Sequence, residues 1–350
     1  MQTDRNLRRR QILLWIVTGV ITVTFTIVIS ELLLMFISPQ ASMYPRSEWS
    51  AEYGFVNWQD RQVVHKKPGR WKYVYTTNRH RNRGPLVPVS NSYSKKNIVV
   101  LGDSNTFGIG VNDGESFAEV ISHELDDGYS VLNLGVGGWG LTQQVRRYYE
   151  FGQLYAPAAV ILQFSLNDLR DNFNNKVTII EDGRFQFVES QSPTNWIKKI
   201  LSDSYIQKSQ IYNLVRDSLY IFFSRRHERQ AMESHATYQD ARIPPDESFY
   251  NDLLELFAGD LHRNGVRLLL ISSDKKQLAS VPYIKEKIVS LERRGVLEYI
   301  DIWEWLENVT DYRSPQGHVW GDRAHAIIGR GLSDIMRQDV TRVIERLVIE

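Results

Sequence analysis

Three apolar runs of β-forming residues constrain what this 350-residue chain can fold into, because each run ends abruptly in small and polar residues. The runs and their endings occupy residues 99–108, 131–140 and 159–168. An apolar run that stops at turn-forming residues is typical of a buried strand, and α/β folds place their ligands beyond the carboxyl ends of such strands. The three endings are therefore candidates for parts of one common site.

The rest of the chain alternates between helical and strand patterns. Helical signals follow the first two strands at Ser116–Leu125 and Thr142–Tyr155. Later segments predict a helix, two strands and a closing helix, at Asp246–Asn264, Val266–Ser272, Leu297–Ile302 and Leu332–Ile349. Strands that alternate with helices predict a parallel sheet with both faces covered.

The three endings carry recognisable residues. They are Gly102-Asp103-Ser104, a glycine-rich turn from Gly135 to Gly140, and Asn167-Asp168. Each has an ordinary explanation, since such residues also make strand-to-helix turns, glycine packing sites and Asx turns. Together, and in this order, they resemble the first three sequence blocks of the SGNH, or GDSL, hydrolases.

The resemblance implies a fold and a chemistry. The fold is a flavodoxin-like three-layer α/β/α parallel sheet, and Ser104 is the nucleophile that attacks an ester carbonyl. The oxyanion hole is formed by Ser104, by Gly138, which lies five residues after the strand residue Asn133, and by Asn167. A side-chain amide at that place can donate to the anion of a tetrahedral intermediate. The resemblance implies neither a cofactor nor a metal.

A serine nucleophile needs a base, and two histidines compete for this role. In the family the base comes from a loop before the final helix, and only His318 and His325 lie in that region. Asp322 and His325 form the literal Asp-x-x-His motif. However, helical periodicity continues directly from His325, which leaves no loop to direct its ring toward Ser104. We therefore expect His318 to be the base.

The third member of the triad is ambiguous if His318 is the base. Gln316 and Pro315 stand where the family has an acid, and neither can orient an imidazolium by charge. Asp311 is the nearest acid upstream, and the loop between could return it to the histidine, so it is our expected third member. Asp322 and a backbone carbonyl are the alternatives.

The N-terminal segment predicts a membrane anchor. Arg5, Arg8, Arg9 and Arg10 precede an uncharged apolar stretch from Ile12 to Ser30, which continues to Ile37 with Glu31 as its only charge. About 20 such residues cross a ~30 Å hydrocarbon core. The stretch is longer than the apolar part of a signal peptide, and the arginines predict a cytoplasmic N-terminus. The localisation expected is single-pass in the inner membrane, with the catalytic domain periplasmic.

Composition excludes several other functions. The chain has no cysteine, which rules out disulfides, metal–thiolate sites and cysteine catalysis. Its net charge is +1 with mixed signs along the sequence, so there is no basic footprint for nucleic acid.

These patterns divide the chain into a cytoplasmic tail, a transmembrane helix, an aromatic periplasmic linker and the hydrolase-like domain. The expected ranges are 1–11, 12–38, 39–95 and 96–340. The last range has an insertion at 172–243, which contains a hairpin turned by Asp182-Gly183 and a helical stretch from Trp196 to Arg225.

The resemblance implies an esterase or O-acyltransferase whose substrate is an ester of a carbohydrate or cell-envelope polymer, and O-acetyl is the ester we favour. It also implies proteins of an envelope polysaccharide assembly as partners. The alternatives are a catalytically silent scaffold of such an assembly and a lipid esterase.

Overall fold

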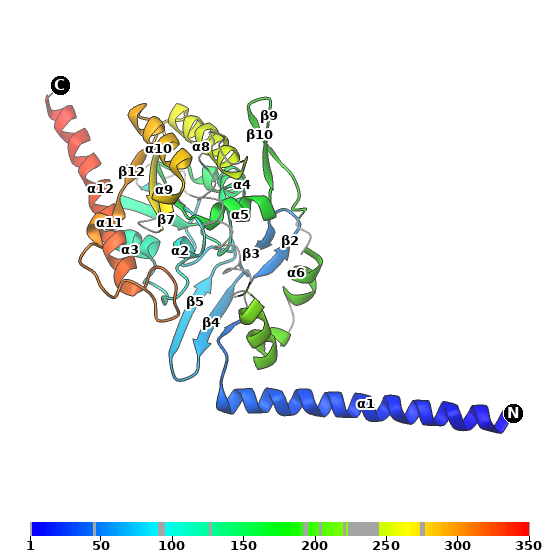
Figure 1. Ribbon diagram of the computed structural model, residues 1–350. Helices are drawn as coiled ribbons and strands as arrows, with labels where there is room; N and C mark the ends of the chain where they lie inside the picture. The colour runs from blue at the N-terminus through cyan, green and yellow to red at the C-terminus, as the bar shows by residue number, and fades with distance from the viewer. Residues whose placement is uncertain are drawn as a thin grey trace.

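A computed structural model describes residues 2–44, 47–89, 95–125, 128–191, 195–202, 205–219, 222, 245–273 and 277–349. Figure 1 shows a globular part from which the long N-terminal helix α1 projects. The predicted stretch Trp196–Arg225 is described as helix α6 (Asn195–Ser202), a 3₁₀ turn at Tyr205–Lys208 and a helix at 210–219. Its last residues, 223–225, and the insertion as far as 243 lie outside the described residues.

A five-stranded parallel sheet forms the centre of the globular part. Its strands lie in the order β7-β6-β8-β11-β12, which are Tyr129–Asn133, Lys96–Leu101, Ala159–Phe164, Arg267–Ser272 and Glu298–Ile300. Numbered along the chain, this is the order 2-1-3-4-5 of flavodoxin-like folds. The predicted fold class is therefore confirmed. The strand order reverses between β6 and β8, and this switch point is where such folds bind their ligands.

Helices cover both faces of the sheet, and each layer closes one half of the core. One half joins side chains of the sheet to α4 (Leu141–Glu150), α8 (Pro245–Arg263) and α10 (Pro282–Arg293). The other half joins the sheet to α3 (Phe117–Glu124), α11 (Ile302–Trp305) and α12 (Asp322–Ile349). Because both faces are covered, the strands are apolar on both sides, as in β8, where every residue is buried.

The segment before the first core strand contains more strand than the sequence pattern predicted. An antiparallel sheet joins β1 (Ser42–Tyr44), β4 (Arg61–Lys67) and β5 (Trp71–Thr77), and β2 (Glu48–Ser50) pairs with β3 (Gly54–Val56). Its aromatic residues pack onto the core, since Tyr53 stacks on Trp139 with ring centroids 4.9 Å apart. The predicted hairpin of the insertion is confirmed as β9 (Thr178–Glu181) and β10 (Arg184–Phe187).

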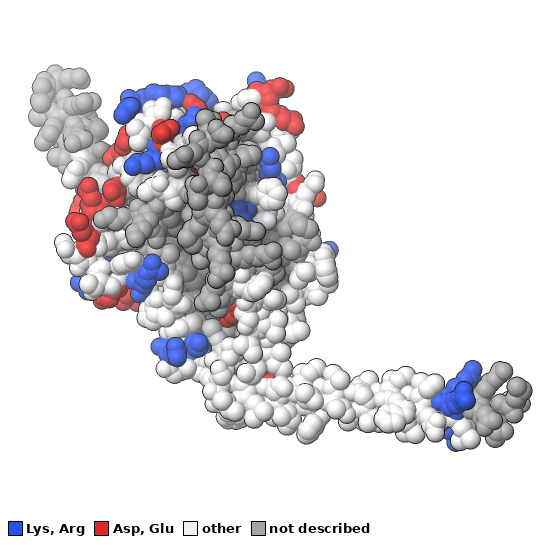
Figure 2. Space-filling view, in the orientation of Figure 1, with Lys and Arg blue, Asp and Glu red and all other residues white. Residues whose placement is uncertain are grey.

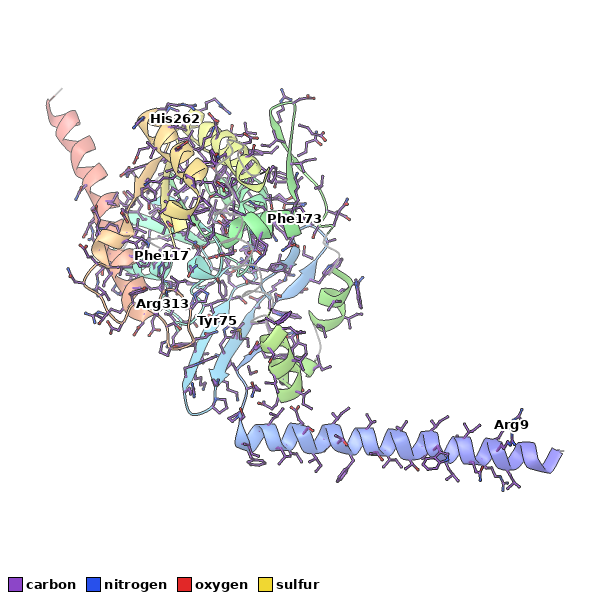
Figure 3. The ribbon with its side chains drawn as sticks, viewed as in Figure 1. Arg9, Tyr75, Phe117, Phe173, His262 and Arg313 are labelled. Carbon is purple, nitrogen blue, oxygen red and sulfur yellow. The ribbon has the colours of Figure 1, made fainter. Side chains whose placement is uncertain are left out.

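Helix α1 (Gln2–Ile37) makes a long apolar rod. Its segment Leu7–Ile37 is long and apolar enough to cross a membrane, although a signal sequence would share these properties. Figure 2 shows an almost uncharged surface along the rod, with basic residues near its N-terminal end, where Figure 3 labels Arg9. A surface of this kind is stable in lipid and costly in water.

Candidate active site

Ser104 begins the short helix α2 (Ser104–Phe107) directly after β6, at the switch point of the sheet. The preceding Gly102 has no room for a side chain, because a Cβ there would lie 2.2 Å from Thr106 Oγ1 and 2.7 Å from Gln163 Oε1. Asp103 caps α2, since its Oδ1 accepts a hydrogen bond from the Asn105 N–H at 2.8 Å. The Gly-Asp-Ser sequence thus forms a tight corner that holds the serine at the edge of the sheet.

His318 lies beside this serine. Its Nε2 is 2.9 Å from Ser104 Oγ, within hydrogen-bond distance. The loop that carries His318 packs closely on Gly110, where a Cβ would lie 2.5 Å from Ser314 Oγ and 3.6 Å from His318 Cβ. Gly110 also has a φ of +96°, so glycine is required there on two grounds. Burial lowers the pKa of His318, and the nearby Asp103 carboxylate opposes that effect.

The structure does not bring an acid to His318 in the way that the sequence led us to expect. Asp311 is exposed, and its carboxylate pairs with Arg323 at 2.7 Å. Asp322 accepts a hydrogen bond from the Arg323 N–H, which is the contact of a helix N-terminus. The buried Nδ1 of His318 has no hydrogen-bond partner within the described part of the chain. The geometry is that of a Ser–His dyad.

His325 has a structural position. It is fully buried, and its Nδ1 accepts a hydrogen bond at 3.1 Å from the N–H of Phe117, the first residue of α3. Its ring also packs edge-on against Trp320. Burial holds its pKa well below the usual range, so it stays neutral. The literal Asp-x-x-His match therefore belongs to the packing of α12 on α3 and is not part of the site.

The second block places glycines next to the serine. A Cβ on Gly137 would lie 3.4 Å from Ser104 Cβ, so this turn passes directly beside Ser104. Gly138 follows in the left-handed region with a φ of +83°, against the ring of Phe55. Asn133 links the block to the first one, because its Nδ2 donates to Thr106 O at 2.8 Å. These contacts position Gly138 beside Ser104.

Asn167, the first residue of α5 (Asn167–Asn174), is held by two carboxylates. Its Nδ2 donates to Asp103 Oδ2 at 3.2 Å and to Asp171 Oδ2 at 2.9 Å. Burial raises the pKa of Asp171 and, more strongly, that of Asp168, and the Asp103 carboxylate adds to both effects. This acidic surrounding, which the sequence did not predict, orients the Asn167 amide at the edge of the sheet.

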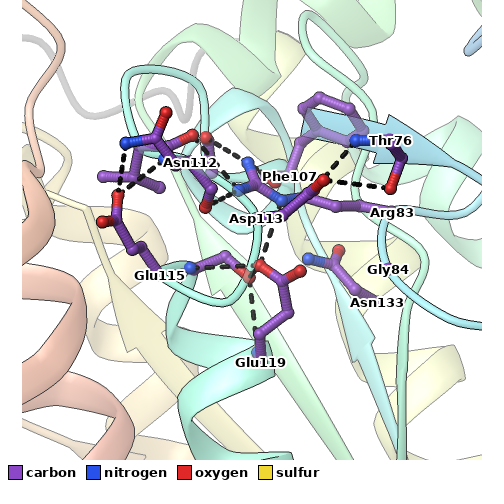
Figure 4. Close-up of polar contacts among 12 residues, drawn as sticks. Thr76, Arg83, Gly84, Phe107, Asn112, Asp113, Glu115, Glu119 and Asn133 are labelled. Atoms are coloured by element: carbon purple, nitrogen blue, oxygen red, sulfur yellow. Dashed lines mark hydrogen bonds and ion pairs between the residues drawn. The ribbon is translucent and has the colours of Figure 1, made fainter. Parts of the chain in front are cut away.

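Arg83 is a second feature that sequence reasoning missed. Its buried guanidinium donates to four backbone carbonyls, those of Phe107, Gly108, Val111 and Asn112, and to the Glu119 carboxylate, as Figure 4 shows. It also lies over the ring of Tyr75, with Cζ 5.0 Å from the ring centroid. The linker before the core thus holds the end of α2 and the loop that follows it. The only signal in the sequence was the basic run at residues 79–83, and nothing in that run indicates which of its side chains is buried.

The residues described include no cluster of three or more His, Cys, Asp or Glu placed to hold a metal ion. The site places a serine hydroxyl beside an imidazole, with a glycine turn and an amide nearby, and an arrangement of this kind can activate the hydroxyl as a nucleophile.

Comparison with known proteins finds likeness in structure only. No family model and no curated protein matches the chain. A protein described as lipolytic and of the G-D-S-L family from Desulfitobacterium hafniense is 12% identical, with a TM-score of 0.42, over 69% of this chain and 99% of its own. The esterase EstA from Pseudoalteromonas is 10% identical with a TM-score of 0.40, and the match covers 71% of this chain and 100% of EstA. Est24, a carbohydrate acetylesterase from Sinorhizobium meliloti, is 11% identical with a TM-score of 0.38, and the match covers 70% of this chain and 99% of Est24. We draw the function from the site geometry, because one fold can host many activities.

Proposed function

We propose that this chain is a membrane-anchored serine esterase or O-acyltransferase that acts by a Ser104–His318 dyad. The observation that carries the proposal is the 2.9 Å contact between His318 Nε2 and Ser104 Oγ at the switch point of the sheet. A hydroxyl is a weak nucleophile at neutral pH and becomes effective when a neutral imidazole can take its proton. The lowered pKa of His318 keeps that imidazole neutral.

The reaction we propose has two steps. Ser104 Oγ attacks the ester carbonyl while its proton passes to His318 Nε2, and the collapse of the tetrahedral intermediate expels the alcohol, which takes that proton. Water, or the hydroxyl of an acceptor, then attacks the acyl-serine in the same manner and regenerates Ser104. The backbone N–H groups of Ser104 and Gly138 donate to the oxyanion, and the Asn167 amide joins them by releasing one of its two carboxylate partners, Asp103 or Asp171.

The third member of a classical triad is replaced here by electrostatics. The imidazolium that forms during catalysis needs a negative charge nearby, and the Asp103 carboxylate is the charged group that raises the pKa of His318. We propose that Asp103 stabilises the imidazolium through space while it caps α2. Removal of the acid from a triad costs less than removal of the nucleophile or base, which is compatible with an active dyad.

The finer parts of the proposal concern substrate and location. We propose that the substrate is an ester, specifically O-acetyl, of a carbohydrate or cell-envelope polymer. We propose that α1 anchors the chain in the inner membrane, that the catalytic part is periplasmic, and that envelope polysaccharide assembly proteins are its partners. The support is the apolar helix with its N-terminal arginines and the resemblance of the three sequence blocks. A non-catalytic scaffold would have no use for a serine and a histidine in contact at this edge.

The test is hydrolysis of p-nitrophenyl acetate by the full chain in lipid nanodiscs. We expect the wild type to release p-nitrophenol and Ser104→Ala to lose nearly all turnover. His318→Ala should match it, because residues that act as one unit are not additive. Ser290→Ala is the matched control, since Ser290 is exposed on α10. A folded Ser104→Ala that keeps wild-type turnover would refute the nucleophile, and a wild type inactive on short acyl esters would favour the scaffold.

A further inference from the structure

Helix α1 contacts the insertion through Glu31, the single charged residue of the apolar stretch from Ile12 to Ile37, which is half-buried. Glu31 accepts hydrogen bonds from Ser209 Oγ at 2.9 Å and from the N–H groups of Gln210 and Ile211, the latter at 3.1 Å. These groups form the N-terminus of helix 210–219, where a carboxylate is favourable. Gln40, just after α1, adds a bond from its N–H to Gln210 Oε1 at 2.6 Å. The anchor and the insertion are thus fixed to each other.

The position of Glu31 along α1 corresponds to a membrane boundary. About 20 helical residues cross a ~30 Å hydrocarbon core, and counting from Ile12, after the arginines, brings the outer boundary to Glu31. A carboxylate is tolerated at that depth, but it is expensive at the centre of the bilayer. Because helix 210–219 is bound at Glu31, its N-terminus lies at the level of the lipid headgroups.

The insertion presents apolar side chains on this side of the molecule. Trp196 and Ile200 of α6 are 64% and 66% exposed, and Val215 and Leu219 of helix 210–219 are 51% and 50% exposed. The last two are four residues apart and so lie on one helical face. Figure 1 shows α6 and helix 210–219, both green, at the right and lower right of the globular part, which is the side on which α1 extends away from it. Exposed apolar surface of this extent marks a site of interaction.

The rim of this surface has the composition of a membrane interface. The ammonium of Lys199 lies 4.9 Å from the ring centroid of Trp49, and that of Lys208 lies 4.4 Å from the ring centroid of Tyr44. Aromatic rings with lysines beside them are typical of protein segments at the headgroup level.

We infer that α6 and helix 210–219 form a lipid-contacting face that rests on the outer surface of the same bilayer that α1 crosses. This inference goes beyond the proposed function but rests on its membrane anchor. The occupant is a lipid surface because the face is continuous with the membrane-spanning helix, and because Glu31 fixes its depth.

Phe173 is a further exposed apolar side chain on this side of the molecule, and α5 joins it to the candidate site. Asn167 begins α5, and Phe173, near the other end of that helix, is 83% exposed. Six residues of helix separate the two by about 9 Å along its axis. Figure 3 shows Phe173 on the right of the globular part, the side on which α1 extends away from it.

The experiment uses the absence of cysteine from the chain, which lets a single introduced cysteine carry a unique fluorescent label. Ile200→Cys and Val215→Cys are labelled with bimane in the full chain, in nanodiscs of phosphatidylcholine and phosphatidylglycerol that contain nitroxide-labelled lipid. Ile27→Cys, about one turn of α1 inside the boundary at Glu31, is the positive control. Asn308→Cys, exposed and three residues after α11, is the negative control, and Figure 1 shows α11 on the opposite side of the globular part from α6.

We expect quenching at residues 200 and 215 to be several-fold greater than at 308 and comparable with that at 27. Quenching no greater than at 308, with residue 27 quenched, would overturn the inference, whether water, a second copy or another segment of the chain covers the face. If residue 27 is unquenched as well, the anchor itself is refuted and the inference with it. Turnover of p-nitrophenyl acetate by the same labelled chains reports on the esterase independently.

Discussion

Replacement of Arg83 by methionine tests whether the segment before the core organises the active site. The change keeps an apolar stem against Tyr75 but removes the guanidinium that donates to four backbone carbonyls and to Glu119. Each buried carbonyl left without a donor costs about 1–3 kcal/mol, although relaxation of the loop and entry of water recover part of the sum. Loss of one partner from a buried charged network typically costs about 3–5 kcal/mol. We expect a loss of that size.

Two measurements follow from this magnitude. At about 2–4 °C per kcal/mol, the melting temperature of Arg83→Met should fall by roughly 6–20 °C. Turnover on p-nitrophenyl acetate, measured well below the new melting temperature, should fall by about 10²-fold. The reason is that the released loop carries Gly108, at the end of α2, and Gly110, against the His318 loop, and a ~1 Å misplacement of reacting groups has an effect of that size.

The control is Arg294→Met, which removes an exposed arginine that pairs with Glu255 at 2.7 Å. An exposed pair contributes about 0–1 kcal/mol, so the control should melt within a few degrees of the wild type and keep its turnover. If Arg83→Met behaves like this control in both assays, Arg83 does not organise the site. If it melts early but keeps full turnover per folded molecule, its role is stability alone.

Three further predictions concern the site itself. The acid limb of the pH–rate profile should have its midpoint below about 6.5, because burial lowers the pKa of His318 and the base must be neutral. Asp103→Asn should move that midpoint lower still, because it removes the carboxylate that opposes the effect of burial. A midpoint that rises in Asp103→Asn would contradict this assignment. Asn167→Ala should lower turnover per folded molecule by ~10²–10³-fold, and normal turnover per folded molecule would leave Asn167 only a structural role. Asp311→Asn should keep turnover within about threefold of the wild type, since it removes only an exposed pair with Arg323, and a severe loss would mean that the loop closes on His318 during catalysis.

The local patterns that sequence reasoning used were sufficient for the core. The strands at 98–101, 131–133 and 159–164 are continuous apolar runs because a parallel sheet buries both of its faces. Each strand could therefore be recognised from its own residues, without knowledge of the strands that pair with it. Gly102, Gly135 and Gly140 follow from the close approach of neighbouring groups, since a Cβ on each would lie only 2.2–2.5 Å from another atom. The choice of His318 over His325 came from helical periodicity, and the structure places the two rings accordingly.

What the sequence could not determine depends on partners far apart in the chain. Arg83 reaches the loop at 107–112, Asn167 meets Asp103 across 64 positions, and Glu31 meets Ser209 across 178. None of these pairings leaves a periodic or local signal, because the side chains are brought together only when strands and helices pack. The same holds for Asp311: proximity along the chain suggested a triad acid, whereas the folded loop pairs that carboxylate with Arg323 in solvent. Local residue pattern thus determined the sheet, the strand ending that carries Ser104 and the apolar helix, while tertiary packing alone decided the electrostatic surroundings of the Ser104–His318 pair and the contacts between α1 and the insertion.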